Sequence, residues 1–565
     1  MTTTLSIAYS VELLGLQAQL VRIEAHLSGG LPQFSIVGLA SGAVREARER
    51  VRAAIETAGF GFPQGRLTVN LAPADLPKTS GHYDLAIALA ILAAAGDIDG
   101  KVLNNWLVFG ELSLTGDLLP LPKAAALGIS VVDRGVRGFD QQAARFSSQP
   151  RLLFPRVNAH DLYLLKDEPT VACVEGLGQA VEGLRGTKKF GSLVMPSDHG
   201  NQGDQCDQGD RETQSKQPAT AGQEETIACA QWFAIHGQEE AKQAALIAAT
   251  GLHNLLLMGP PGVGKSMIAH SLNGLMPSLA PSQSREVQSI HALSGTGGSA
   301  GSIALRPDAR LPCLPPFRAP HHTASAVALV GGGQPVIPGE VSLAHRGVLF
   351  LDELPEFGRS SLEALREPLE TGEVHVVRMR TRLSLPARAL LVAAMNPCPC
   401  GYYGASSGPK LCHCSSEQVQ RYRMRLSGPL LDRFDLALLL SRQSPPATTR
   451  PAPADTDAAG LYKATRLRIQ RARQRAEDRQ GCANAHLTPE QLLAQAGLFS
   501  EQARYLLRQF MNASGNSLRV HDRLLRVALT VADLEEAATV EPAHMAKAIE
   551  MRRGLDRPDA IKALA

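Results

Sequence analysis

The sequence predicts an α/β fold that gives way to a helical part near the C-terminus, and three observations support this. Short apolar runs at residues 34–39, 254–258 and 348–351 have the length and composition of strands. The second and third runs are continuous and end in glycine-rich or polar turns, which is typical of buried parallel strands. From Leu461 onward the apolar residues follow a helical period.

The N-terminal part of the chain is expected to form an α/β domain. Residues 67–71 predict a further strand, and residues 41–58 predict an amphipathic helix. The longest nearly apolar run, at residues 85–96, is shorter than the roughly 20 residues that a membrane span needs. Residues 122–155 look irregular, so the sequence does not define the end of this domain.

Two stretches of biased composition divide the chain. Residues 196–226 hold almost no apolar side chain, and residues 443–460 are rich in Pro and Ala. Such segments bury too little apolar surface to offset the entropy lost on ordering, so both are predicted to be linkers, the first of them flexible. The predicted domains are therefore 1–195, 227–442 and 461–565.

Composition limits the functions open to the chain. Its 565 residues suggest three or four domains of about 150 residues each. The formal net charge of +3 excludes a histone-like or acidic-tail protein, so any nucleic-acid contact requires a local cluster of charge. The N-terminus lacks the features of a secretory signal, so a cytoplasmic location is expected. In that reducing compartment the nine cysteines argue against a disulfide framework.

A phosphate-binding motif follows the strand predicted at residues 254–258. This GxxxxGK[ST] motif comprises Gly259, Pro260, Pro261, Gly262, Val263, Gly264, Lys265 and Ser266. Its glycines let backbone N–H groups face phosphates, Lys265 reaches the β- and γ-phosphates, and the hydroxyl group of Ser266 ligates magnesium. The motif predicts ATP and Mg²⁺ as ligands, against the alternative of a glycine-rich turn that matches by chance.

Polar residues end two further predicted strands. Asp352 and Glu353 follow residues 348–351, where Asp352 would hold the magnesium and Glu353 would polarise the attacking water. Asn396 ends the strand predicted at residues 389–395, where it would orient that water or sense the γ-phosphate. For the two carboxylates the alternative is a solvated acidic turn.

Five motifs together resemble the magnesium-chelatase-like AAA+ ATPases of the YifB/ComM type: GPPGVGKS, LFLDE, AAMNPCPCG, LLDRFD and RLLRVALTVADL. The resemblance covers most of the chain and implies an AAA+ P-loop NTPase core followed by a C-terminal helical lid. The N-terminal part resembles the Lon-protease-like (S5 domain 2-like) domain of this family, which implies a binding or assembly module. A protease dyad of Ser80 and Lys123 is not favoured, because the small residues around a Lon nucleophile are absent near Tyr83.

The resemblance implies roles for three polar residues. Asn396 would be the sensor 1 residue, Arg433 an arginine finger for a neighbouring subunit, and Arg519 the sensor 2 arginine of the lid. An arginine finger acts on a neighbour's nucleotide, which implies a ring, here a homo-hexamer. The alternatives are an ion pair for Arg433 and a solvated helix position for Arg519. The side chains that compete with these assignments are Asp432, Asp435, Arg523 and Arg526.

An arginine-rich segment indicates DNA binding. The family is similar to replicative-helicase AAA+ domains in having an insertion, here matched by residues 294–347, and a hairpin, here matched by residues 373–385. Alternation in the hairpin places three arginines on one face of a strand, namely Arg378, Arg380 and Arg382. Projected into the pore of a ring, that face would bind phosphates, although a solvated strand face is the alternative. A basic run at residues 463–479 is equally well explained as a solvated helix face.

Four clustered cysteines predict a metal site. They are Cys398, Cys400, Cys412 and Cys414. Paired thiolates at each end of a short loop suit a tetrahedral structural zinc, although the C-x-C spacing is tighter than usual and His413 could replace one ligand. Reduced thiols without a metal are the alternative.

Together these features predict an ATP-dependent hexameric DNA motor. The resemblance implies a branch-migration helicase that acts on branched or three-stranded DNA, with recombination proteins as partners, when DNA is integrated during natural transformation. Two alternatives stay open: a remodelling ATPase whose Lon-like domain binds a protein client, and a magnesium-chelatase-type motor subunit. No membrane partner is expected.

Overall fold

The computed structural model divides the chain into two compact units. The first comprises Met1–Arg211 and Pro281–Pro312, and the second comprises Glu212–Ala280 and Cys313–Ala565. The described residues are 4–38, 42–76, 78, 81–138, 141–148, 151–166, 171–191, 193, 228–235, 237–294, 314–333, 336–378, 381–403, 411–441, 455–514 and 517–556. The first predicted linker and most of the second lie outside these ranges.

A mixed sheet forms the centre of the first unit, in the order β10-β9-β5-β1-β2-β4-β3 with β8 paired to β2. Its strands are β1 (Thr4–Leu14), β2 (Gln17–Ser28), β3 (Gln33–Val37), β4 (Arg66–Ala72), β5 (Leu107–Val108), β8 (Val136–Arg137), β9 (Leu152–Pro155) and β10 (Val171–Val174). A short separate pair is formed by β6 (Glu111–Leu112) and β7 (Leu118–Leu119). The strands predicted at residues 34–39 and 67–71 are confirmed as β3 and β4.

The helices of the first unit include one that is buried along nearly its whole length. They are α1 (Gly42–Thr57), α2 (Asp84–Ala95), α3 (Gly100–Leu103), α4 (Ala124–Arg134), α5 (Gln141–Ser148), α6 (Leu177–Leu184) and α10 (Pro281–Leu293). α1 confirms the helix predicted at residues 41–58, and α2, an almost wholly apolar segment, packs against β1 and β2. The buried carboxylate of Asp84, at the start of α2, pairs with Arg50 of α1 (2.9 Å).

The prediction that residues 122–155 are irregular is wrong, because they form α4, β8, α5 and β9. α4 is made of small and aliphatic residues that are buried consecutively, so no polar face marks its helical period in the sequence. α10 lies against α4, where Arg134 pairs with Glu286 (3.3 Å) and Arg285 with Asp133 (3.0 Å). α10 thus belongs to the first unit, although the predicted domain 227–442 includes it.

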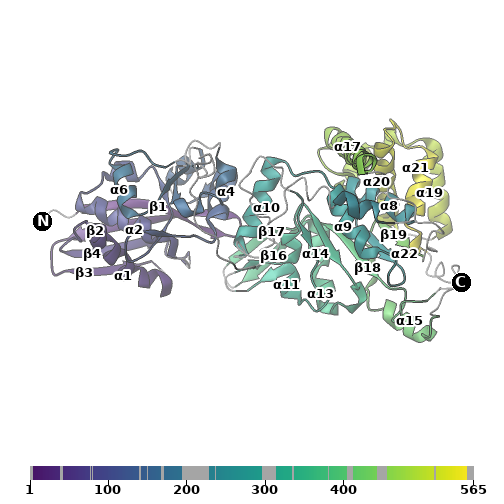
Figure 1. Cartoon of the computed structure of the whole chain (residues 1–565), viewed down its shortest axis with the longest axis horizontal. Helices are drawn as coiled ribbons and strands as arrows, with labels where there is room; N and C mark the ends of the chain where they lie inside the picture. Colours follow the sequence, from purple (N-terminus) through teal and green to yellow (C-terminus); the bar gives the residue numbers. More distant parts are fainter. Residues whose placement is uncertain are drawn as a thin grey trace, which may run out of the picture. The chain divides into compact units, whose positions relative to one another are not determined.

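A parallel sheet in the order β12-β15-β18-β11-β19 forms the centre of the second unit (Figure 1). Its strands are β11 (Leu255–Met258), β12 (Phe317–Arg318), β15 (Val348–Leu351), β18 (Leu390–Met395) and β19 (Leu436–Leu439). The strands predicted at residues 254–258, 348–351 and 389–395 are confirmed, and β11, β15 and β18 are buried throughout. Because neighbouring strands run in the same direction, the residues that follow these three strands meet at one edge of the sheet.

Helices surround this sheet and continue to the C-terminal part of the described chain. They are α8 (Glu239–Gly251), α9 (Lys265–Leu275), α11 (Ala326–Val330), α12 (Glu340–Leu343), α13 (Arg359–Ala364), α14 (Arg366–Thr371), α15 (Ser416–Arg423), α16 (Gly428–Leu431), α17 (Asp455–Gln480), α18 (Pro489–Ala494), α19 (Glu501–Ser514), α20 (Leu518–Leu534), α21 (Pro542–Glu550) and α22 (Arg553–Asp556). α17 begins within the predicted linker at residues 443–460. Thr488 and Glu541 are the N-cap residues of α18 and α21, and Pro489 and Pro542 are the first residues of these helices.

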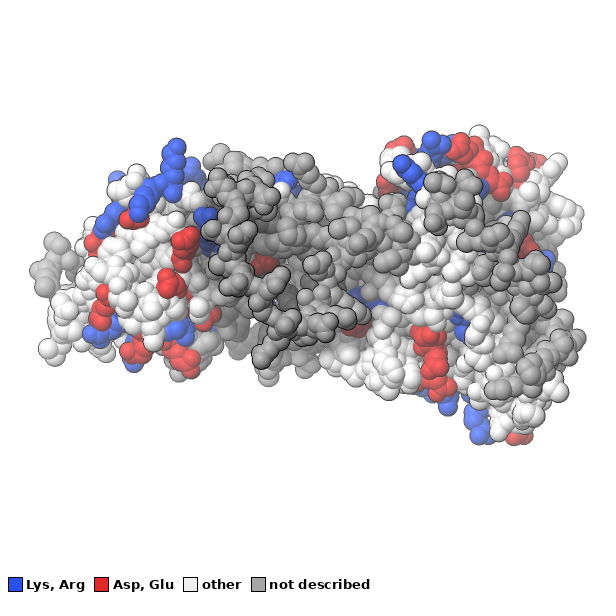
Figure 2. All heavy atoms as spheres, viewed as in Figure 1, with Lys and Arg blue, Asp and Glu red and all other residues white. Residues whose placement is uncertain are grey.

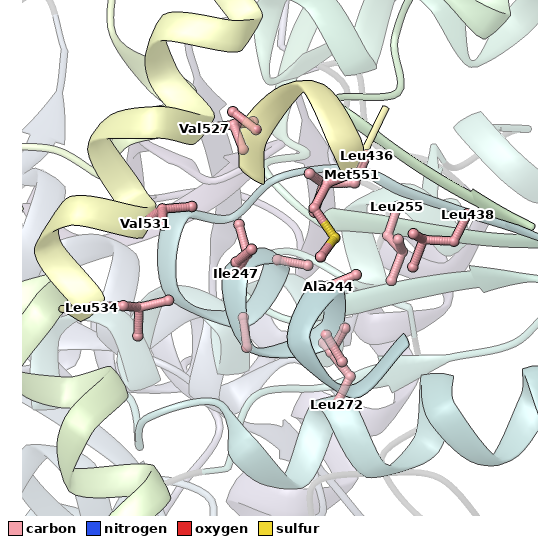
Figure 3. Close-up of a cluster of buried hydrophobic side chains, with 14 of the residues drawn as sticks. Ala244, Ile247, Leu255, Leu272, Leu436, Leu438, Val527, Val531, Leu534 and Met551 are labelled. Atoms are coloured by element: carbon pink, nitrogen blue, oxygen red, sulfur yellow. The ribbon is translucent and has the colours of Figure 1, made fainter. Parts of the chain in front are cut away.

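The C-terminal helices and the parallel sheet share one hydrophobic core (Figure 3). Ile247 of α8, Leu272 of α9 and Val531 of α20 lie in the same cluster as Leu255 of β11 and Leu438 of β19. Burial of such side chains stabilises the fold by about 1.5–3 kcal/mol each. The position of α20 is therefore set by the strand that leads into the phosphate-binding motif.

A hairpin of β16 (Glu373–Arg378) and β17 (Thr381–Pro386) confirms the one predicted at residues 373–385. Arg378 lies opposite Thr381, and Val377 lies opposite Arg382. The prediction that three arginines share one face of a single strand is therefore wrong, because the chain reverses between them and no Gly or Pro marks the turn. The side chains of Arg378 and Arg382, and all of Arg380, lie outside the described residues. The described part of the predicted insertion holds β12, α11, β13 (Gly331–Gly332), β14 (Ile337–Pro338) and α12.

Surface charge is mixed on the face shown in Figure 2, where described Lys and Arg side chains lie among Asp and Glu side chains. This agrees with the small net charge of +3. Among the described helices, none combines the length and the apolar composition needed to cross a membrane.

We expect Leu255→Ala to lower the free energy of unfolding of the second unit by about 2–5 kcal/mol, because Leu255 is fully buried and its removal leaves a cavity. Trp106 and Trp232 are the two tryptophans of the chain, so a Trp106→Phe background leaves Trp232, in this core, as the fluorescent probe of urea unfolding. Leu493→Ala is the matched control, because Leu493 is 76% exposed. An equal effect of both changes would contradict the assignment of Leu255 to the core.

Candidate functional site

The phosphate-binding motif forms the loop between β11 and α9. Gly262 and Gly264 have φ angles of 80° and 92°, in the left-handed region that favours glycine, so they allow the loop to turn. Lys265, the first residue of α9, is buried, and its Nζ donates hydrogen bonds to two loop carbonyl oxygens (2.7 and 3.0 Å). The same Nζ donates to Oδ1 of Asn396, at the end of β18 (3.0 Å). The ammonium group therefore lies between the loop and the neighbouring strand.

Two carboxylates follow β15 at the same edge of the sheet. Oγ of Ser266 donates a hydrogen bond to Oδ2 of Asp352 (3.0 Å), whose Oδ1 accepts one from the backbone N–H of Glu353 (2.9 Å). The side chain of Glu353 is half-exposed and lies 3.5 Å from Nδ1 of His322. The structure thus brings together five predicted residues: Lys265, Ser266, Asp352, Glu353 and Asn396. His322 comes from the insertion and was not predicted, because only a His-His pair marks it in the sequence.

The charges of this edge suit a magnesium-bound polyphosphate. Burial lowers the pKa of Lys265, whereas Asp352 and Glu353 raise it. The negative charge of a bound phosphate would also raise the pKa of Lys265 and so favour its charged form. The hydroxyl group of Ser266 and the carboxylate of Asp352 are hard oxygen donors in mutual contact, and such donors fit Mg²⁺.

Arg433 lies elsewhere in the second unit, beside a cavity of about 640 Å³. The residues that line this cavity include eight charged ones: Arg388, Arg433, Arg519, Arg523, Arg526, Glu370, Asp435 and Asp522. No residue of the phosphate-binding motif lines it. The structure therefore places Arg433 and Arg519 together, apart from Lys265.

The guanidinium group of Arg433 is held by α14. It donates a hydrogen bond to Glu370, and its Nε is buried without a partner. Burial lowers the pKa of Arg433, Glu370 raises it, and the neighbouring arginines lower it again. The ion pair thus involves Glu370 rather than Asp432 or Asp435, the two partners considered from the sequence.

Asn254, which precedes β11, links the strands of the sheet to the Arg433 segment. Its Nδ2 donates to the carbonyl oxygen of Arg433 (2.9 Å), and its Oδ1 accepts from the backbone N–H of Leu391 in β18 (2.9 Å). Its backbone N–H donates to Oδ2 of Asp435 (3.1 Å), whose own N–H donates back to the carbonyl oxygen of Asn254 (3.0 Å). Sequence analysis missed this residue, because a single Asn before a strand belongs to no motif.

Asp435 lies among positive and polar groups. Burial by itself raises the pKa of Asp435, but contacts with His253 (3.6 Å) and Arg523 (3.6 Å) outweigh burial and lower it to about 2. Arg523 also donates a hydrogen bond to the carbonyl oxygen of Phe434 (2.9 Å). Arg523 therefore supports the Arg433 segment in addition to lining the cavity, and Arg519 lines the cavity from the first turn of α20.

The basic run at residues 463–479, in α17, is largely engaged in structural contacts. Arg473 donates to carbonyl oxygens at the end of α8 (2.5–3.1 Å), and Arg468 donates to one at the end of α20 (2.9 Å). Arg479 forms an ion pair with Asp533 of α20 (2.7 Å). A cation near the C-terminus of a helix interacts favourably with the partial negative charge there. These arginines therefore help to join α17 to α8 and α20.

The four predicted cysteine ligands come together after β18. Their Sγ atoms all lie within 4.8 Å of one another. Cys398 lies 3.3 Å from Cys400 and 3.8 Å from Cys412, close to the roughly 3.8 Å between sulfurs of a tetrahedral zinc site with bonds of about 2.3 Å. Burial of Cys400 is outweighed by hydrogen bonds from the backbone and the other thiols, which lower its pKa, whereas burial raises the pKa of Cys398 and of Cys412, so a metal would have to displace their protons. The four thiols fit a zinc ion, and His413 is exposed outside the cluster.

The protease dyad considered from the sequence has no structural counterpart that can be described. Ser80 lies outside the described residues, and Lys123 precedes α4. Lys78, a buried lysine close to Ser80 in the sequence, donates to the carbonyl oxygens of Gly38, which follows β3, and of Leu71 in β4 (3.1 Å each), so it joins these two strands.

The second unit is thus a P-loop α/β protein whose parallel sheet is consistent with an AAA+ core of the magnesium-chelatase kind. Three family models match the chain. The model described as magnesium chelatase, subunit ChlI, matches residues 231–447. Those described as subunit ChlI of Mg-chelatase and as magnesium chelatase, subunit ChlI C-terminal, match residues 23–139 and 462–552.

Relatives extend over almost the whole chain. YifB of Escherichia coli (strain K12) is 37% identical over 557 residues, which cover 98% of both chains. Competence protein ComM of Haemophilus influenzae is 38% identical over 551 residues, which cover 97% of both chains. The magnesium-chelatase 38 kDa subunit of Rhodobacter capsulatus is 27% identical over only 29% of this chain and 49% of its own length. This chain belongs to the magnesium-chelatase-like YifB/ComM family.

We expect the stability of the second unit to fall by about 2 kcal/mol as the pH drops from 4 to 2, because the pKa of Asp435 is lower in the folded than in the unfolded chain. The contribution is present above pH 4, where the carboxylate is ionised in both states, and is lost on protonation. Asp435→Asn should remove this contribution at neutral pH and flatten the acid branch. Urea unfolding followed by Trp232 fluorescence measures both effects.

Asp478→Asn is the matched control for Asp435, because Asp478 is exposed on α17. It should change stability by no more than about 0.5 kcal/mol. If the stability of Asp435→Asn falls between pH 4 and pH 2 as steeply as that of the unsubstituted chain, a group other than Asp435 causes the loss.

Proposed function

We propose that the chain is an ATP-driven DNA motor that works as a hexameric ring and moves DNA branch points when DNA is integrated during natural transformation. The observation that carries the proposal is the convergence of Lys265, Asp352 and Asn396 at one edge of a parallel sheet. This arrangement suits phosphoryl transfer, which needs positioned charge more than covalent chemistry. The likeness to Competence protein ComM along nearly the whole chain supports the DNA-related role.

Each residue at this edge has a distinct proposed task. Lys265 would bind oxygen atoms of the β- and γ-phosphates in place of the carbonyl oxygens that it contacts. Ser266 and Asp352 would hold Mg²⁺, which neutralises phosphate charge when bound. Glu353 would accept a proton from the attacking water, and Asn396 would orient that water.

Arg433 would complete the ATP site of a neighbouring subunit. Its cavity is not lined by the phosphate-binding motif, which supports a role on the nucleotide of a second copy of the chain rather than on its own. Arg519 lines the same cavity and would contribute charge there, in its predicted sensor role. Glu370 would have to release Arg433 when a phosphate takes its place.

The other parts of the chain receive matching proposals. The first unit would be the Lon-like binding or assembly module, and the helices from α17 onward would be the lid. Branched or three-stranded DNA and recombination proteins would be the partners, in the cytoplasm. A remodelling ATPase with a protein client is the second candidate, because an assembly module suits protein ligands. A chelatase motor is less well supported, because the chelatase relative matches only 29% of the chain.

The cysteine cluster would hold one structural Zn²⁺, since its four sulfurs lie within 4.8 Å. We expect metal analysis of the purified chain to find about one zinc per subunit, and chelation to release it. Less than about half an equivalent would contradict the zinc assignment.

We expect Lys265→Ala and Arg433→Ala to lower ATP hydrolysis at least about 10³-fold each, because one loses the phosphate contact and the other the finger. Mixing the two variants should restore part of the activity. In a mixed ring, Lys265 of the Arg433→Ala subunit can share an ATP site with Arg433 of the Lys265→Ala subunit. ATPase rates measured at fixed total protein test this. Failure of the mixture to exceed the sum of its parts would contradict action between subunits.

We expect forked or three-stranded DNA to stimulate ATP hydrolysis, and Arg378→Ala with Arg380→Ala to weaken DNA binding. The loss of two phosphate contacts should reduce the slope of log K against log salt concentration by about 2. Lys463→Ala with Arg471→Ala is the matched control, because it also removes two positive charges, from side chains exposed on α17. This control should leave DNA binding and its salt dependence nearly unchanged. Absence of DNA stimulation would contradict the motor and favour the protein-client candidate.

A further inference from the structure

The cysteine cluster lies directly beside the proposed ATP site. Cys398 is two residues beyond Asn396, whose Oδ1 accepts a hydrogen bond from Lys265. The backbone of this connection is fixed, because Pro397 and Cys398 are both buried. A metal that holds Cys398 therefore also limits where Asn396 can lie.

A second contact joins the cluster to the phosphate-binding loop itself. Gly401 is buried, has a φ angle of 83°, and follows Cys400 in the sequence. A Cβ atom at Gly401 would lie only 2.7 Å from Cδ of Pro261 and 3.8 Å from Cγ of Asn396. The cysteine loop thus packs against both the loop that would bind phosphate and the side chain that would sense it, with no space for a methyl group.

Hydrogen bonds reinforce this arrangement from the cysteine side. The backbone N–H of Gly401 donates to the carbonyl oxygen of Cys398 (3.0 Å), and that of Tyr403 donates to Sγ of Cys398 (3.3 Å). The guanidinium group of Arg423 lies 5.2 Å from the ring centre of Tyr403. The turn from Cys398 to Tyr403 is therefore a compact unit, which Cys412 and Cys414 close from the other end.

We propose that zinc in the cysteine cluster controls nucleotide binding, by holding the turn at Gly401 against Pro261 and Asn396. This inference rests on the proposed ATP site and adds a metal requirement to it. Binding of Zn²⁺ replaces thiol protons with zinc–sulfur bonds, and no oxidation or reduction is involved. Without the metal, no bond joins Cys398 and Cys400 to Cys412 and Cys414, so the turn loosens and the phosphate-binding loop loses its support.

Zinc content and nucleotide affinity, measured on the full-length chain, test the proposal. The probe is a fluorescent, non-hydrolysable ATP analogue with Mg²⁺. We expect chelation of zinc, and the double change Cys412→Ser with Cys414→Ser, to remove the metal and weaken analogue binding about tenfold or more. Returning Zn²⁺ should restore affinity in the chelated chain but not in the double variant. Cys173→Ser, a buried cysteine of the first unit, should change neither quantity.

Gly401→Ala separates the packing contact from the metal. It keeps all four cysteines, so zinc should stay at about one equivalent while analogue affinity falls. Gly481→Ala is the matched control, because Gly481 has a similar φ angle of 75° but no atom within 4 Å of the position that a Cβ would take there. It should leave affinity unchanged, and Trp232 fluorescence should show that each variant is folded.

Two outcomes would overturn the proposal: a zinc-free chain that binds the analogue with unchanged affinity, or a Gly401→Ala chain that does so. Analogue binding by Lys265→Ala distinguishes an error in the ATP-site assignment from an error in the proposed control by zinc. If this change leaves analogue binding intact, the ATP site itself is wrong. If it abolishes binding while zinc removal does not, only the control by zinc is wrong.

Discussion

The hydrogen bonds of Asn254 are the constraint on which the arrangement of the second unit depends. One side chain and its peptide group hold the start of β11, the second residue of β18 and the segment that carries Arg433. Loss of such an amide would leave buried donors and acceptors unpaired, at about 1–3 kcal/mol for each group. These hydrogen bonds thus fix β11, β18 and the Arg433 segment relative to one another. They do so at the end of the sheet opposite the phosphate-binding loop.

Packing extends this registration to the C-terminal helices. α20 contributes Val531 to the same core as Leu255, so the arginines at the start of α20 are fixed relative to β11. Asp435 and Arg523 then join the Arg433 segment to that helix. Packing and this ion pair thus fix the residues of the arginine-lined cavity relative to the sheet.

Sequence predicted the central strands and the five residues at the sheet edge, because apolar runs and a glycine-rich loop are local signals. It did not predict the helix α4, whose buried small residues show no periodicity, and it predicted the hairpin at residues 373–385 without placing its reversal after Arg378, which has no Gly or Pro to mark it. Glu370 and Asn254 were also missed. Their importance comes from contacts with residues distant in the sequence, which no motif records.

The docking of α10 on α4 has a consequence for how the chain can be divided. Only five residues, 276–280, separate α10 from the phosphate-loop helix α9, yet α10 packs within the first unit. A cut in the stretch 196–226 would therefore not release two self-contained fragments. Residues 1–195 alone would lack α10, and the rest of the chain alone would carry α10 without α4, with apolar side chains such as Val287 and Ile290 exposed. The first unit is built from two separate stretches of the sequence, with part of the second unit between them. A chimera that takes the first unit from a relative would therefore have to take α10 from the same relative.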